Sequence, residues 1–85
     1  MADLADWRCR IDEIDGKLVT LLNERASCAR KIGEIKHGAG IDILDPERER
    51  EIITRIRNLN AGPLSDDDFF GIFETIIASC RKIEM

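Results

Sequence analysis

The stretch from residue 4 to residue 36 constrains this chain most strongly, because it contains no proline and its apolar spacing is regular. Alternating steps of three and four residues connect Leu4, Trp7, Ile11, Ile14, Leu18, Leu21, position 25, Cys28, Ile32 and Ile35. This spacing predicts one long helix with a continuous packing stripe. The cluster His37-Gly38-Ala39-Gly40 then predicts a turn, with His37 as a loop residue rather than a ligand.

Two shorter helices are predicted in the rest of the chain. Asp45 and Pro46 supply an N-cap acceptor and a proline at the first helical position, and Asn60-Ala61-Gly62-Pro63 ends that helix. Ser65 is the expected N-cap of the next helix. The expected apolar faces comprise Ile52, Ile53, Ile56 and Leu59 in the first of these helices, and Phe69, Phe73, Ile76, Ile77, Cys80 and Ile83 in the second.

The helix lengths predict how the chain is assembled. At about 1.5 Å per residue the first helix spans roughly 50 Å, which exceeds the width of a compact domain of this size. Two helices of about half that length cannot cover its whole stripe. We therefore expect an all-α fold with one long and two shorter helices, residues 1–85 as a single domain, and an intertwined homodimer.

Composition argues against several other classes of protein. Thirteen basic and 17 acidic residues give a formal charge of −4, which offers no general attraction for nucleic acid or an anionic membrane. The three cysteines have no C-x-x-C spacing, so neither a disulfide framework nor a metal site is predicted. No apolar targeting segment follows Met1, and no run has the length of a membrane span. The expected location is the cytoplasm.

A charge occupies a place in the long stripe where an apolar residue is expected. Arg25 there requires a partner, which could be a structural carboxylate such as Glu24 or Glu49. Lys36 lies 11 residues further on and points in nearly the same direction, with apolar residues between the two cations. Two cations that flank a small apolar stretch predict a trough for a small anion.

Further charges extend the inward faces of the shorter helices. Arg48 and Glu49 precede Ile52 and Ile53 by four residues, and Glu84 follows Cys80 by four. Any one of them alone is more commonly a solvated helix end, but together with the trough they predict a polar pocket inside a helical bundle. Arg8 lies about 25 Å along the helix from Arg25 and could reach such a pocket only from a second subunit.

These residues carry a resemblance to a known family. The runs Trp7-Arg8-Cys9-Arg10-Ile11-Asp12-Glu13-Ile14-Asp15, Leu21-Leu22-Asn23-Glu24-Arg25 and Ile35-Lys36 resemble the first helix of the α-helical chorismate mutases. The later segments Asp45-Pro46-Glu47-Arg48-Glu49, Asn60-Ala61-Gly62-Pro63-Leu64 and Ile72-Phe73-Glu74-Thr75-Ile76-Ile77 are similar to that family's later helices. The likeness covers nearly the whole chain, and its ordered set of charged positions is specific.

The resemblance implies a reaction without a cofactor or a metal. Chorismate rearranges to prephenate in one pericyclic step, so the enzyme needs to hold a compact conformer and to stabilise charge on the ether oxygen. By this likeness, Arg25 would bind one carboxylate and Arg8 of the other subunit the second. Lys36 would contact a carboxylate and the ether oxygen.

The resemblance also implies roles for five further residues. Asp45 and Glu49 would hold the ring hydroxyl, while Arg48 would orient the carboxylates. Cys80 stands where many relatives carry serine, so a hydrogen bond from it to a carboxylate would be weaker. Glu84 stands where many bacterial relatives carry glutamine and fungal relatives carry glutamate. We expect that Glu84 must be protonated to help, which would make activity rise toward acidic pH.

Two alternative functions remain open on sequence alone. An isochorismate pyruvate lyase has a similar fold and pocket. A catalytically silent regulatory or dimerisation domain would also share the family's features, but Arg25 and Lys36, whose loss would favour silence, are both present. The chain could also act with another enzyme of the shikimate pathway, or be one domain of a larger protein.

Overall fold

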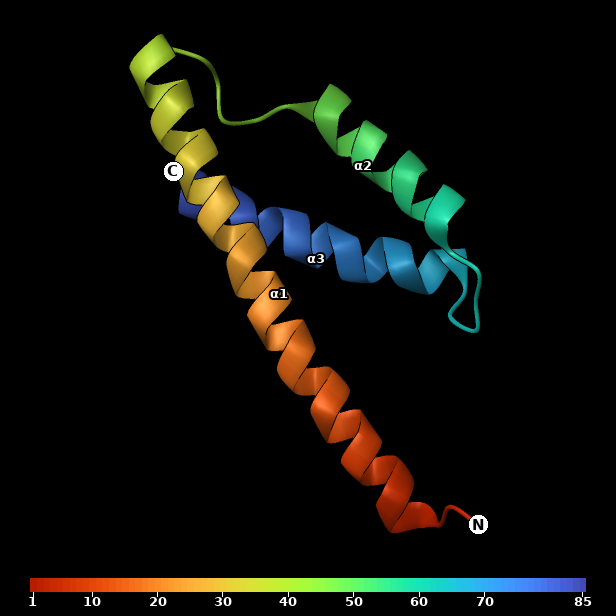
Figure 1. Cartoon of the computed structure of the whole chain (residues 1–85). Helices are drawn as coiled ribbons and strands as arrows, with labels where there is room; N and C mark the ends of the chain where they lie inside the picture. The colour runs from red at the N-terminus through yellow and green to blue at the C-terminus, as the bar shows by residue number, and fades with distance from the viewer.

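The computed structural model describes residues 1–85 as three α-helices without any strand, and the predicted all-α class is confirmed. Helix α1 spans Leu4–Ala39, α2 spans Pro46–Leu59 and α3 spans Asp66–Glu84 (Figure 1). Helix α3 packs against both other helices, whereas α1 and α2 do not contact each other. The position of α2 relative to α1 therefore depends on α3.

The helix starts follow the capping pattern in the sequence. Asp3 and Asp6 form a reciprocal capping box at the start of α1. The Oδ1 atom of Asp45 accepts the backbone N–H of Arg48 at 3.1 Å, and Pro46 is the first residue of α2. Ser65 caps α3 in the same way. The expected caps at Asp45 and Ser65 are thus confirmed.

The end of α1 differs from the expectation. The helix continues through His37 to Ala39 and ends at Gly40, whose φ of 66° is left-handed. A left-handed residue after a helix is nearly always glycine, because a side chain there clashes with the backbone. The prediction of His37 as a loop residue was therefore wrong, since one glycine in the cluster, Gly40, provides the stop.

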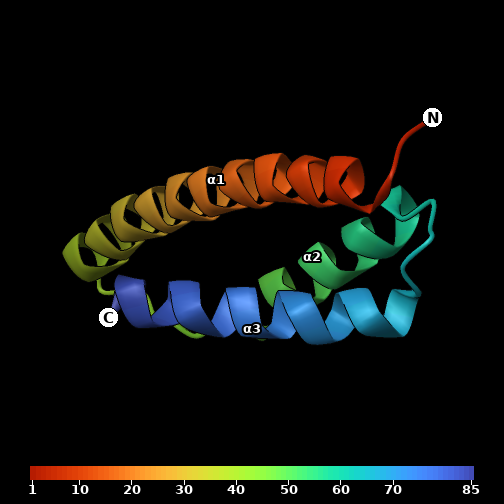
Figure 2. The ribbon, with the colours of Figure 1, turned by 90° about the horizontal axis from the view of Figure 1, so that it is seen from below.

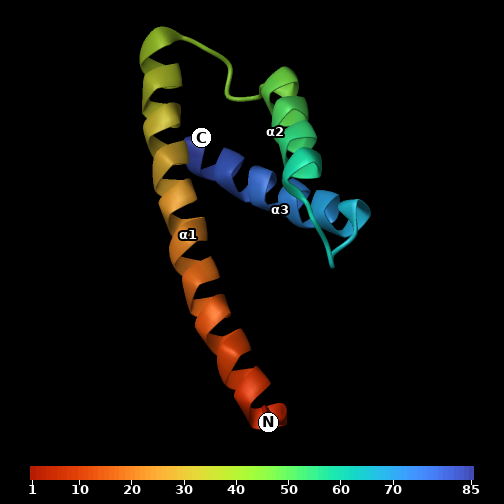
Figure 3. The same cartoon turned by 45° about the vertical axis from the view of Figure 1, so that its right-hand side comes forward.

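The chain is elongated, with extents of 58 × 23 × 15 Å. Its radius of gyration of 16.1 Å exceeds the about 12 Å of a compact domain of this length. The N-terminal half of α1 extends away from the other helices (Figures 1 and 3). Large apolar side chains are exposed along this half at Leu4, Trp7, Ile11, Ile14, Leu18, Val19, Leu21 and Leu22. None of the three helices has the length and apolar composition to cross a membrane.

The buried core is confined to one crossing of helices. Only Ala29, Gly33, Ile77 and Cys80 are buried, and they belong to the C-terminal third of α1 and to α3. Figure 2 shows α1 approaching α3 at the C-terminal ends of both helices. The expected burial of Ile83 and Leu59 is not found, since they are 41% and 67% exposed in the single chain.

Candidate functional site

A cavity of about 420 Å³ lies beside this crossing and is lined by residues of all three helices and of the α1–α2 loop. Its volume lies within the range of small-molecule sites. Seven of the eight residues predicted from the sequence line it, namely Arg25, Lys36, Asp45, Arg48, Glu49, Cys80 and Glu84. The structure therefore brings together side chains that the sequence places as far as 59 positions apart.

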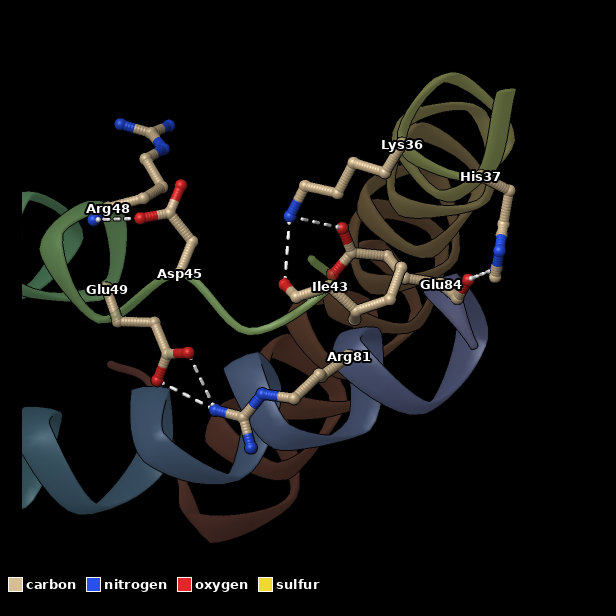
Figure 4. Close-up of polar contacts among 8 residues, drawn as sticks. All are labelled: Lys36, His37, Ile43, Asp45, Arg48, Glu49, Arg81 and Glu84. Atoms are coloured by element: carbon tan, nitrogen blue, oxygen red, sulfur yellow. Dashed lines mark hydrogen bonds and ion pairs between the residues drawn. The ribbon is translucent and has the colours of Figure 1, made fainter. Parts of the chain in front are cut away.

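Lys36 and Glu84 form the most enclosed polar pair of the cavity. The Nζ atom of Lys36 lies 3.3 Å from Oε1 of Glu84, and the two side chains are 15% and 14% exposed. The same Nζ donates a hydrogen bond to the carbonyl oxygen of Ile43 at 2.9 Å (Figure 4). The ammonium group of Lys36 is thereby fixed at the wall of the cavity by the α1–α2 loop and by α3.

A second ion pair joins α2 to α3. The Nη2 atom of Arg81 donates to Oε1 and Oε2 of Glu49 at 2.7 and 2.8 Å, and both side chains are about one-third exposed. Arg81 was not predicted as a site residue, although it follows Ile77 by four residues and so extends the inward face of α3. The same spacing had identified Glu84 after Cys80.

Arg25 is the half-buried cation of the cavity without an ion-pair partner. No carboxylate oxygen lies within 4 Å of its guanidinium group, and Glu49 pairs with Arg81. The apolar side chains of Ala29 and Ile32 line the cavity beside it. Within the single chain, therefore, neither Glu24 nor Glu49 serves as a structural ion-pair partner for Arg25.

Two other predicted residues lie at the rim near the start of α2. Asp45 is engaged by its own helix as the N-cap. The guanidinium group of Arg48 reaches 3.3 Å from Glu51, and this pair is about 60% exposed. In Figure 4 the side chain of Arg48 points away from the pair of Arg81 and Glu49. Asp45 is therefore held by its cap, whereas the side chain of Arg48 is less constrained than that of Lys36.

Arg8 is the predicted site residue that the single chain does not bring to the cavity. It is exposed, lies on the N-terminal half of α1 and does not line the cavity. Its role therefore stays a prediction that depends on a second copy of the chain.

The charges of the cavity favour an anionic ligand only weakly. Four cationic and three anionic side chains line it, which leaves a net charge of +1. The anions are largely engaged, since Glu49 and Glu84 have cationic partners and Asp45 caps a helix. No cluster of three or more His, Cys, Asp or Glu side chains could hold a metal ion. The arrangement can therefore bind and polarise an anion, but offers no set of metal ligands.

Comparison with known sequences identifies the family of this chain. The model of the family chorismate mutase type II matches residues 7–85. A chorismate mutase of Methanocaldococcus jannaschii is 54% identical over 82 residues, which cover 95% of this chain and 83% of that protein. The bifunctional chorismate mutase/prephenate dehydratase of Aquifex aeolicus is 42% identical over 99% of this chain, which spans 24% of that protein.

The fold comparison gives the same result. Form II of the chorismate mutase of Thermus thermophilus superimposes with a TM-score of 0.93 at 26% identity, covering 95% of this chain and 92% of that one. A conserved hypothetical protein from Pyrococcus furiosus gives a TM-score of 0.81 at 30% identity and covers 96% of this chain and 95% of that one. The family match over nearly the whole chain and the 54% identity show that this chain belongs to the chorismate mutase type II family.

Proposed function

We propose that this chain catalyses the rearrangement of chorismate to prephenate in the synthesis of phenylalanine and tyrosine. The observation that carries the proposal is the unpaired guanidinium group of Arg25, in the same cavity as the fixed ammonium group of Lys36. An unpaired, half-buried cation is costly unless a ligand compensates it. A dicarboxylate that lies between Arg25 and Lys36 supplies that compensation.

The geometry suits a unimolecular reaction. Cations at separate points of the cavity hold the two ends of the substrate and so favour its compact conformer. Lys36, held by the carbonyl oxygen of Ile43, is placed to stabilise negative charge as it develops on the ether oxygen. Glu49, held by Arg81, keeps lone pairs to accept the ring hydroxyl. No nucleophile or metal is needed for any of these steps.

We further propose that the working enzyme is a homodimer in which Arg8 of one subunit enters the other's cavity. A net charge of +1 does not neutralise a substrate with two carboxylates, and one more arginine supplies the missing charge. The exposed apolar stripe on the N-terminal half of α1 is too large to remain in water and would be covered by a second long helix. The residue and the stripe lie on the same half of α1.

We also propose a location for the enzyme and a second kind of partner. We place the enzyme in the cytoplasm, where its three free cysteines stay reduced. The relative from Aquifex aeolicus combines a chorismate mutase with a prephenate dehydratase. Contact with another enzyme of the shikimate pathway, in the same or another chain, is the second partnership we propose.

The first prediction concerns the reaction itself. The purified protein should consume chorismate and form prephenate, and Arg25→Ala should lower kcat/KM by about 100-fold or more, because the carboxylate loses its cation. The loss of chorismate absorbance measures this, with Arg55→Ala on the outer side of α2 as the control. Two results would contradict this prediction. If the folded wild-type dimer leaves chorismate unchanged but releases pyruvate from isochorismate, the protein is a lyase. If it is inactive on both compounds, it is a regulatory domain.

The second prediction tests the shared site. Arg8→Ala and Arg25→Ala should each be nearly inactive alone. When they are unfolded together in equal amounts and refolded, about one quarter of wild-type activity should return, because half of the dimers have one complete site of two. A mixture no more active than the mean of the two parents would show that Arg8 does not act across subunits.

The third prediction concerns Glu84. A protonated Glu84 can donate to the ether oxygen and no longer pairs with Lys36, whereas the ionised form accepts only. The rate at saturating chorismate should therefore rise as the pH falls from about 8 to 5. Glu84→Gln, whose amide donates at every pH, should flatten this dependence. An identical profile in wild type and Glu84→Gln would contradict the assignment.

The fourth prediction concerns Arg81. Arg81→Met should lower kcat/KM about tenfold, because Glu49 loses two charge-assisted hydrogen bonds. In a Glu49→Gln background the same substitution should have little further effect. Lys31→Met, which removes an exposed pair with Glu34, is the control. Additive losses from Arg81 and Glu49 would show that the two residues act separately.

A further inference from the structure

The last turn of α3 is held unusually close to α1. A Cβ atom added at Gly33 would lie 2.6 Å from the carbonyl oxygen of Glu84 and 2.7 Å from its Cα atom. The backbone of Glu84 thus rests directly on the backbone of α1. Because the obstructing atoms are main-chain atoms, no side-chain rotation could make room for a larger residue at position 33.

His37 holds the same point of α3 from the next turn of α1. Its Nε2 atom lies 3.0 Å from the carbonyl oxygen of Glu84 (Figure 4). A carbonyl oxygen only accepts, so Nε2 is the donor. The last carbonyl groups of a helix have no partner within the helix, and this bond satisfies one of them. Gly33 and His37 are four residues apart and therefore lie on one face of α1.

The side chain of Glu84 is held as firmly as its backbone. It pairs with Lys36 and is only 14% exposed. Its neighbours in sequence, Ile83 and Met85, are 41% and 80% exposed. Helix ends ordinarily fray, but here one turn of α1 fixes the main chain and the carboxyl group of Glu84 together.

We propose that Gly33 and His37 are positioning residues that fix the C-terminal turn of α3 so that the carboxyl group of Glu84 enters the cavity. This inference rests on the proposed function, in which Glu84 contacts the reacting atoms. Gly33 permits the close approach, and His37 locks it by a hydrogen bond to the main chain. Neither residue lines the cavity.

Two glycine substitutions on the same helix provide a matched test. Gly33→Ala forces the last turn of α3 away from α1, whereas a Cβ atom at Gly38 would meet nothing within 4 Å. Both changes remove a glycine from the same helix and raise its intrinsic helix propensity alike. Gly33→Ala should lower kcat about tenfold with a smaller change in KM and should flatten the pH profile. Gly38→Ala should leave both unchanged.

Substitutions of His37 test the hydrogen bond by itself. His37→Leu removes the donor while keeping a side chain of similar size, and His37→Gln retains an N–H group. We expect His37→Leu to lower kcat and His37→Gln to restore most of it. In a Glu84→Ala background, neither Gly33→Ala nor His37→Leu should lower kcat further, because the group they position is absent.

Hydrogen exchange separates this inference from the proposed function. The backbone amides of residues 81–85 should exchange faster in Gly33→Ala and His37→Leu than in wild type and Gly38→Ala, whether or not chorismate is a substrate. Unchanged exchange in both variants would contradict the proposal that Gly33 and His37 fix the last turn of α3. Faster exchange with full kcat in an active enzyme would overturn the positioning role and leave the mutase function intact. A wild type without mutase activity would contradict the proposed function instead.

Discussion

The close approach of α1 and α3 at small residues is the contact on which the rest of the structure depends. All four buried residues lie there, and the two on α1, Ala29 and Gly33, have the smallest side chains. Small residues allow the backbones to approach, and the longer charged side chains on either side then reach the same space. Because α2 touches only α3, this one contact also determines where the charges of α2 lie.

The positions of the polar groups in the site depend on this contact to different degrees. Lys36 is fixed by groups from the loop and from α3, so it is placed as soon as the helices cross. Glu49 comes from α2 and is tied to the crossing only through Arg81. Arg25 lines the cavity beside the crossing without an ion-pair partner, and in the proposed function it is the cation that binds the ligand. For the proposed dicarboxylate substrate, the cavity of the single chain would thus need one more positive charge.

Local and periodic signals account for what the sequence predicted well. Caps and the spacing of three and four depend on residues within one or two turns of each other, and they located the helices and the inward charges that line the cavity. The features that were missed depend on distances between helices. Nothing local distinguishes Gly33 from Gly38, yet only the first meets α3. The role of His37 arises only because the end of α3 lies beside it. Helical spacing could have identified Arg81 as an inward residue. Its ion pair with Glu49, however, forms only because α2 packs on α3.

The ion pair of Lys36 and Glu84 has a consequence for the proposed function. In the empty cavity the ammonium group satisfies a carboxylate that is 14% exposed, and burying that carboxylate without a partner is costly. A substrate carboxylate that took the place of Glu84 at Lys36 would leave the charge of Glu84 without this partner. Glutamine at this position would have no charge to compensate. In the proposed function, a glutamate at this position would therefore tie substrate binding to the charge of Glu84, and the contacts proposed for Gly33 and His37 would keep the group in place while its partner changes.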